Sequence, residues 1–507
     1  MKKIVNIVNF VRACEPRDAT VDLVGTLKNE ISLNKKYGFP NTILMQYDAM
    51  ITPEFQNIFK TEKDDNTELG IWFECVRQLV EECGIKWRGP EDVTWDWHII
   101  PGFLMAYSIH ERKAMIDEFM TKFKEIFGYY PASVGSWLLD SWSVNYMEEA
   151  YDVKAFVICR EQYGVDAYTV WGGYYNQGYY PAKNNIMCPA QTKENAVNAP
   201  VFKMLGPDPI YCYDEEEFET GIDRGCATME PIWKYGNNKK IFTSYLDSYY
   251  KEECMDFAYS TVGQENPFGW NNFGDALMMQ MEIINERSMA GEFVIEKLCD
   301  TGEWFKNTFT NNPQVSLISH DDWADNGLKS VWFNCKNYRA NLFVDNTKLY
   351  FRDITKFDER YNERYLDVPC TTMTAYYDNL PVVDGRLWND ENIKAGLKFD
   401  ADISEFNSQK ENGILVCRAT SDKGEIVVSF HDERICITKP ANVKMYFERG
   451  VNINTEVFET QINVCEKSVE FIHNNFLYSA EFNTEVIRTD MGYELKGEKI
   501  EIYLGNL

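Results

Sequence analysis

Apolar runs and helix-like periodicities alternate along the first ~310 residues of the chain, the pattern of a parallel α/β layout. Strands are predicted at Lys3–Val11, Thr42–Gln46, Leu69–Phe73, Ser133–Leu139, Lys154–Cys159, Val201–Leu205 and Tyr259–Val262. Helices are predicted at Val21–Tyr37, Glu74–Cys83, Glu111–Phe127 and Ser141–Glu149, with Gly128 as a stop and Ser141 as a cap. One long helix is expected from Phe273 to about Phe309.

The pattern changes near Asn311-Asn312-Pro313. Beyond this point short alternating runs are separated by turn residues, which is typical of a β-sandwich. Examples are Gly413–Arg418, Glu425–Phe430, Lys444–Glu448, Val469–Ile472 and Ile500–Leu504. We therefore expect two domains, residues 1–312 and 313–507, the second all-β and sandwich-like.

Carboxylates follow strand after strand in the first domain. They are Glu15, Asp48, Glu74, Asp140 and Glu161, with Asp208 and Glu265 in later loops. In a β/α barrel the carboxyl ends of all strands converge on the face that holds the active site. The competing interpretation is that each acid only caps the helix that follows its strand. Aromatic neighbours favour a site.

The segment Trp171–Pro181 is rich in aromatic and amide side chains and poor in aliphatic ones. Flat rings stack on sugar faces, and amides bind hydroxyl groups. Substrate-binding candidates are Trp137, Trp171, Tyr174, Tyr175, Asn176, Gln177, Trp270 and His98, together with the acids Glu15, Asp48, Glu74, Glu161 and Asp208. Some of these rings are expected to be core. The segment holds no carboxylate, so it can orient a sugar but cannot cleave one.

The composition of the chain limits the classes of partner that it can bind. The net charge of -28 argues against nucleic acid and against an anionic membrane surface. No apolar run reaches the ~18 residues of a membrane helix, and no leader-like segment follows Met1. The fourteen cysteines lie singly, which favours reduced thiols and a cytoplasmic location. A carbohydrate substrate is expected, and a homo-oligomer stays open.

The sequence lacks the motifs of several enzyme classes. The chain has no phosphate-binding loop, no G-x-G-x-x-G after a strand and no G-x-S-x-G. Its five histidines include no pair at helical metal-binding spacing. We expect neither a cofactor nor a metal, although a mixed Asp/Glu/His metal site stays open.

Three stretches carry a resemblance to a known superfamily. They are Glu68–Glu74, Phe127–Trp137 and the block from Gly128 to Asn185 with Leu205–Pro209. Residues 1–310 resemble the glycoside hydrolase/deacetylase superfamily, and the long block is similar to uncharacterised gut-bacterial proteins described as glycoside hydrolases. The resemblance implies a (β/α)7-8 TIM-like barrel followed by the β domain. Deacetylases of the superfamily bind metal through an Asp and two His, whereas this chain offers Trp72 and Glu74 there.

The order of elements in that resemblance implies two catalytic residues. Asp140 matches the nucleophile or base after the fourth strand, and Glu265 matches the late general acid, with Glu230 and Asp247 as rivals for the second role. The prediction is a cytoplasmic glycoside hydrolase that uses a carboxylate pair. Two alternatives stay open: a metal-dependent deacetylase-like hydrolase using Asp48, Glu74 and His98, and a non-catalytic carbohydrate-binding protein.

Overall fold

A barrel-like sheet organises the first half of the molecule. The computed structural model describes residues 1–213, 227–252, 254–390, 392–450 and 460–505. The strand order is β12-β1-β2-β3-β4-β5-β11-β8, with β13 beside β1. All pairs from β12 to β11 are parallel, and β8 runs antiparallel to β11. The bounds are β1 (Lys2–Val11), β2 (Asn41–Met45), β3 (Thr67–Trp72), β4 (Ser133–Gly135), β5 (Ala155–Ile158), β8 (Gly178–Tyr179), β11 (Val201–Lys203), β12 (Phe257–Val262) and β13 (Val294–Glu296).

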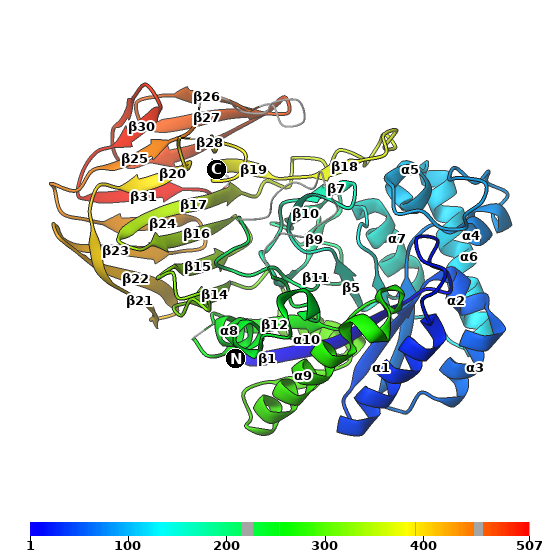
Figure 1. The fold of residues 1–507 in the computed structure, drawn as a ribbon. Coiled ribbons are helices and arrows are strands. Elements are labelled where there is room, and N and C mark those ends of the chain that lie inside the picture. The colour runs from blue at the N-terminus through cyan, green and yellow to red at the C-terminus, as the bar shows by residue number, and fades with distance from the viewer. Residues whose placement is uncertain (214–226, 253, 391, 451–459, 506–507) are drawn as a thin grey trace.

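These strands are apolar throughout because both of their faces are covered. Side chains such as Phe10, Leu44, Val157 and Tyr259 fill the inside of the sheet, and helices cover the outside (Figure 1). The helices are α1 (Leu23–Tyr37), α2 (Tyr47–Ile51), α3 (Pro53–Thr61), α4 (Arg77–Glu82), α5 (Ile99–Gly102), α6 (Ile109–Phe127), α7 (Ser141–Tyr151), α8 (Lys239–Tyr250), α9 (Trp270–Met289) and α10 (Leu298–Thr308). Short 3-10 turns are η1 (Leu104–Ala106), η2 (Trp233–Tyr235) and η3 (Asn266–Phe268).

One buried amide joins the two edges of this sheet. The Gln177 Nε2 donates to the Tyr259 carbonyl at 3.0 Å, and the Tyr259 amide donates back to Gln177 Oε1 at 3.1 Å. The Gln177 carbonyl accepts from the Lys203 amide at 3.3 Å. Gln177 therefore stands in for ladder hydrogen bonds between β12 and the β11 edge, so the sheet is nearly closed.

The second half contains two large antiparallel sheets that share one apolar core. The first has the order β14-β15-β16-β17-β20-β25-β30-β29, with β19 beside β17, and the second has the order β21-β22-β23-β24-β31-β28-β27-β26. The first comprises β14 (Val315–Ser319), β15 (Lys329–Asn334), β16 (Tyr338–Asp345), β17 (Lys348–Lys356), β19 (Leu380–Asp384), β20 (Gly396–Phe399), β25 (Met445–Glu448), β29 (Val486–Arg488) and β30 (Gly492–Leu495). The second comprises β21 (Ile403–Glu411), β22 (Ile414–Ser421), β23 (Gly424–Phe430), β24 (Arg434–Thr438), β26 (Thr460–Val464), β27 (Ser468–His473), β28 (Phe476–Phe482) and β31 (Lys499–Tyr503).

A segment of the second half returns to the barrel-like sheet (Figure 1). Its strand β18 (Ala375–Tyr377) pairs in parallel with β7 (Tyr168–Val170), which pairs with β6 (Gln162–Val165). A separate two-stranded ribbon joins β9 (Pro181–Ala182) to β10 (Asn185–Pro189). The Glu363 carboxylate reaches the same region and accepts from the backbone amides of Ser141 and Ile186, both at 2.9 Å. The two halves are thus connected beyond the chain itself.

The structure corrects two sequence predictions. The prediction of one long helix from Phe273 to about Phe309 is wrong. The helix α9 ends at Met289, Gly291 has a φ of 80°, and the strand β13 lies between α9 and α10. Helical periodicity could not reveal that Val294–Glu296 pairs with β1. Asp140, not Ser141, caps α7 by accepting from the Ser143 amide. The domain boundary near Pro313 stays a prediction, and α10 and β14 lie on either side of it.

Within the described ranges, no helix is long and apolar enough to cross a membrane.

Candidate active site

The turn after β12 places Glu265 beside the end of β1. Gly263 adopts a φ of 136°, and a Cβ there would lie 1.9 Å from the Val8 carbonyl oxygen, so only glycine permits this close approach. The Phe10 amide then donates to the Gln264 carbonyl at 3.1 Å. Asn266 exchanges two 2.9 Å hydrogen bonds with the Arg12 backbone. Glu265 and Arg12 are thereby held face to face.

Arg12 joins two carboxylates from different strand ends. Its Nε and Nη2 each donate to Glu74 at 2.9 Å, a bidentate pair, and its Nη1 donates to Glu265. Gln46 Nε2 also donates to Glu74, at 2.6 Å. Burial lowers the pKa of Arg12, but the charges of Glu265 and Glu74 outweigh burial and raise it. The cluster is an ordered carboxylate–guanidinium–carboxylate unit.

A cavity of about 280 Å³ opens above this unit. Residues that follow β1, β3, β4, β5 and β12 line it, so it lies at the carboxyl ends of the parallel strands. Its aromatic lining is Trp95, Trp97, Phe103, Trp137, Tyr168 and Phe268. Its polar lining is Arg12, Arg17, Glu74, Arg160, Gln162, Asp166, Glu230, Lys234 and Glu265.

Glu265 has the environment of a general acid. Burial raises the pKa of Glu265 to about 7; the charges of Glu74 and Glu230 add to this, and Arg12 opposes it. One carboxylate oxygen contacts Arg12, and no described residue donates a hydrogen bond to the other. Glu265 is therefore partly protonated near neutral pH and has one oxygen available to a ligand.

Glu230 is a second carboxylate in the cavity, held more loosely. Its side chain is 21% exposed, Arg160 lies 3.8 Å away, and Gln264 Nε2 donates to it at 3.5 Å. Because these contacts are long, the carboxylate can engage a ligand without breaking a strong ion pair. Glu74, by contrast, is committed to Arg12 and Gln46.

A larger cavity of about 540 Å³ lies between residues 210–213 and strands β16 and β17. Its one carboxylate among the described residues is Asp345, which lies 3.3 Å from Lys394. Its described lining has aromatic walls and no second acid, so these residues do not supply a carboxylate pair for acid–base chemistry.

The structure places three predicted site residues at the smaller cavity: Glu74, Trp137 and Glu265. Asp140 lies elsewhere, with no exposed surface. Its carboxylate accepts from Arg112 at 3.0 Å and from the Ser143 amide and hydroxyl at 2.9 and 2.7 Å. Burial, followed by the charge of Asp140, raises the pKa of the adjacent Glu363 to about 8. Asp140 is a buried helix cap, and both of its carboxylate oxygens accept hydrogen bonds from the protein.

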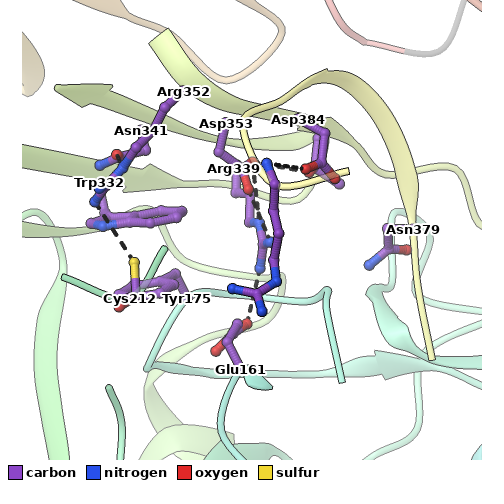
Figure 2. Close-up of polar contacts among 12 residues, drawn as sticks. Glu161, Tyr175, Cys212, Trp332, Arg339, Asn341, Arg352, Asp353, Asn379 and Asp384 are labelled. Carbon is purple, nitrogen blue, oxygen red and sulfur yellow. Dashed lines mark hydrogen bonds and ion pairs between the residues drawn. The ribbon is translucent and has the colours of Figure 1, made fainter. Parts of the chain in front are cut away.

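Glu161 also lies away from the cavity, at the junction of the two halves. Figure 2 shows it facing Arg339, with Asp353 and Asp384 beyond. The Arg339 guanidinium lies 2.9 Å from Glu161 and 3.1 Å from Asp353, and Lys203 lies 3.6 Å from Glu161. All four of these side chains are at most 1% exposed. This network joins β5 and β11 to β16 and β17.

The aromatic segment Trp171–Pro181 is buried rather than presented to the cavity. Tyr175 stacks on Trp332 at 3.7 Å, and the Tyr174 hydroxyl donates to the Pro313 carbonyl at 2.7 Å. Asn176 donates to the Pro207 carbonyl at 2.8 Å, and Trp171 packs edge-on to Tyr213. These contacts make the segment a packing layer between the barrel-like sheet and β15.

The remaining predicted residues lie outside the cavity lining. Glu15 accepts from Arg17, and Asp48 accepts from the Ala13 and Ala49 amides. His98 lies 2.6 Å from Asp96, and Asp208 accepts from Trp323 at 2.6 Å. Trp270 begins α9 and packs on Phe273.

The sequence offers two alternatives to Glu265 as the general acid. Glu230 lines the cavity, whereas Asp247 lies on α8, 2.8 Å from Arg287.

Sequence reasoning missed the cationic part of the site. Arg12, Arg17 and Arg160 also follow predicted strands, next to acids that were selected. A search for charged residues after predicted strands finds these arginines when it includes basic as well as acidic side chains.

The sequence resemblance to deacetylases implies a metal, for which the candidate ligands are Asp48, Glu74 and His98. Asp48, Glu74 and His98 each have separate partners, and Glu74 is bound by a guanidinium. In the described part of the chain, no three His, Cys, Asp or Glu residues are grouped so as to hold a metal ion. The described residues do not fit the metal centre of that family.

Known proteins that this chain is similar to include one family and several solved structures. The family model described as Domain of Unknown Function DUF3863 matches residues 49–339. A solved structure from Parabacteroides distasonis, provisionally described as a glycoside hydrolase/deacetylase, is 15% identical with a TM-score of 0.56, over 75% of this chain and 90% of that one. A probable polysaccharide deacetylase from Pseudomonas aeruginosa PAO1 is 11% identical with a TM-score of 0.36, over 61% and 92% of the two chains. The comparison with curated proteins gave no match.

The first of these similarities shows that this chain shares its fold with that protein. The architecture is mixed α/β, with a barrel-like sheet followed by antiparallel sheets.

Proposed function

This chain belongs to the DUF3863 family, and we propose that it is a carbohydrate-processing hydrolase that cleaves a glycosidic bond with a carboxylate pair. The observation that carries the proposal is the cavity in which Glu265 and Glu230 share one aromatic-lined space. Glycoside hydrolysis needs an acid on the leaving oxygen and a second carboxylate at the anomeric centre.

Glu265 is the proposed general acid. A general acid works best when its pKa lies near the operating pH, and burial raises the pKa of Glu265 to about 7. Arg12 fixes one oxygen of this carboxyl group, so the other oxygen carries the proton toward the leaving group. Glu74 orients Arg12 and is a positioning residue.

Glu230 is the proposed second carboxylate, acting as base or nucleophile. It lies close enough to Glu265 for its charge to raise the pKa of that group. Two such carboxyl groups in different environments are the arrangement from which acid and base roles arise. Asp140 does not enter the proposal, because both of its oxygens accept hydrogen bonds from buried protein groups and it lies outside the cavity lining.

Aromatic side chains provide faces for a sugar. Trp97, Trp137 and Phe268 are half-buried members of the lining, so part of each ring is open to the cavity. The name of the Parabacteroides distasonis protein adds support for a carbohydrate substrate. We interpret the architecture as a (β/α)7-8 TIM-like barrel followed by a β-sandwich-like domain, the first of which holds the chemistry.

The test is a screen of wild type and Glu265→Gln on chromogenic glycosides of both anomers and on oligosaccharides. We expect wild type to release product from at least one substrate and Glu265→Gln to lower kcat about 10²–10⁴-fold. Glu230→Gln should give a similar loss. Asp247→Asn, which removes an acid outside the cavity, is the matched control and should leave kcat within about twofold.

Unchanged thermal unfolding of the variants would show that the losses are chemical. Binding of a sugar without turnover by wild type would identify a carbohydrate-binding protein and reject the hydrolase. Activity that requires an added metal and is lost with chelator would reject the metal-free carboxylate mechanism.

A further inference from the structure

The cavity departs from the charge balance of the rest of the chain. The whole sequence has 79 acidic and 51 basic residues in 507. The fifteen described lining residues include four basic ones, Arg12, Arg17, Arg160 and Lys234, and four acidic ones. Basic residues therefore make up about one in four of the lining residues and about one in ten of the whole chain. A strongly acidic protein repels anions, so this local supply of cations needs an explanation.

Arg12 is accounted for by its two carboxylates, but Arg17 is not part of that unit. Its Nε and Nη2 donate to the two oxygens of Glu15 at 2.7 and 2.6 Å. The guanidinium carbon also lies 5.3 Å from the Trp95 ring and 5.4 Å from the Trp97 ring. One buried carboxylate and two indoles thus fix its orientation.

The third nitrogen of this guanidinium is left for a ligand. No described residue accepts a hydrogen bond from Arg17 Nη1, and the Arg17 side chain is 42% exposed while lining the cavity. Its charge is felt at Glu265, where it opposes the rise in pKa. A second arginine, Arg160, is 9% exposed and follows β5 in the same lining.

We propose that the cavity selects an anionic sugar, and that Arg17 is the specificity-determining residue that receives its acid group. This inference rests on the proposed function, because it names the substrate class of the same site. Guanidinium groups bind carboxylate, sulfate and phosphate through charge-assisted hydrogen bonds. Trp97 lies in the same lining, where its ring contacts the Arg17 guanidinium and stacks on His98, so it helps to hold Arg17 at the cavity.

The test compares anionic and neutral sugars that are otherwise matched. Glucuronic acid, glucose 6-sulfate and glucose 6-phosphate are titrated against glucose, and galacturonic acid against galactose, by calorimetry or ligand-observed NMR on the full chain. Wild type should bind at least one anionic sugar about tenfold or more tightly than its neutral partner. That preference should shrink with added salt.

Arg17→Gln should weaken binding of the anionic sugar about tenfold to hundredfold and leave the neutral sugar within about twofold. Arg17→Lys should give an intermediate loss, since it keeps the charge and loses the planar fork. Arg77→Gln removes an exposed cation paired with Glu81 outside the cavity and controls for net charge. It should bind both sugars as wild type does.

Equal binding of acidic and neutral sugars, or an equal loss of both in Arg17→Gln, would overturn this inference and leave the hydrolase proposal standing. Binding of inorganic sulfate or phosphate as tightly as the sugar would show a plain anion site and also overturn it. Failure of every sugar in both arms to bind would reject the proposed function together with the inference.

Discussion

Two clusters in this molecule each join one arginine to two carboxylates, but they differ in how completely the rest of the chain covers them. At the cavity, Arg12 joins Glu74 and Glu265, and one oxygen of Glu265 faces open space. At the junction, Arg339 joins Glu161 and Asp353, and the second half of the chain covers them completely.

Glu74, Glu265 and Glu161 each follow a parallel strand, so position along the chain does not separate them. What separates them is coverage. A buried ion pair that the rest of the chain covers completely specifies packing, whereas one left partly open at a cavity can accept a substrate.

The largest expected effect is the loss of the covered cluster. Arg339→Met should lower the free energy of unfolding by about 3–5 kcal/mol, because Glu161 and Asp353 would remain buried without their main cation. Urea unfolding measures this change. Arg77→Met, at an exposed pair, should cost less than about 1 kcal/mol. A similar small cost for Arg339→Met would show that the junction tolerates unpaired charge.

The protonation of Glu265 at the cavity should control how kcat/KM depends on pH. The general acid must be protonated, and the pKa of Glu265 is about 7, so kcat/KM should fall about tenfold per unit as pH rises above 7. The measurement uses whichever glycoside the screen identifies. Glu265→Gln should remove this limb. A profile that is flat from pH 6 to 9 would argue against Glu265 as the acid.

Asp140 tests the contrast directly, because it combines a strand-end position with complete coverage. Asp140→Asn keeps the shape and part of the helix cap but weakens the hydrogen bond from Arg112. We expect a loss of about 1.5–3 kcal/mol in unfolding free energy. The kcat of the folded protein should stay within about threefold of wild type. Abolished turnover with unchanged stability would return Asp140 to the mechanism.

The smallest expected effect concerns a buried acid with no described partner. Burial raises the pKa of Glu30 in α1 well above its ordinary value, and neither of its oxygens has a hydrogen-bond partner in the described structure. The unfolded chain therefore releases this proton first, so stability falls as pH rises from about 4.5 toward the folded pKa. Glu30→Met should raise the free energy of unfolding at pH 7 by about 1–2 kcal/mol.

Thermal unfolding followed between pH 4.5 and 8 checks the Glu30 prediction. The difference between Glu30→Met and wild type should shrink toward the acid end, where the wild-type carboxyl is protonated. Glu54→Met, at an exposed position of α3, is the control and should show no such pH dependence.

Much of the secondary structure could be predicted because it is local. The strand Lys3–Val11 is observed as Lys2–Val11, and Gly128 ends α6 in the left-handed conformation. The helix beyond Met289 could not be predicted, because its interruption depends on pairing with β1, almost 300 residues earlier. The aromatic segment Trp171–Pro181 has the composition of a sugar site, but its rings are buried against β15 and the residues around Pro313.

By itself, the sequence determined the alternation of strands and helices, the change to β structure near Pro313, and the placement of charged residues at strand ends. Only the tertiary structure decided which of those charges are covered and which face a cavity. Periodicity and capping act within a few turns of chain, whereas coverage depends on residues such as Arg339 and Glu363 that arrive from the other half. That is why Glu265 and Asp140 look alike in the sequence and differ in the folded protein.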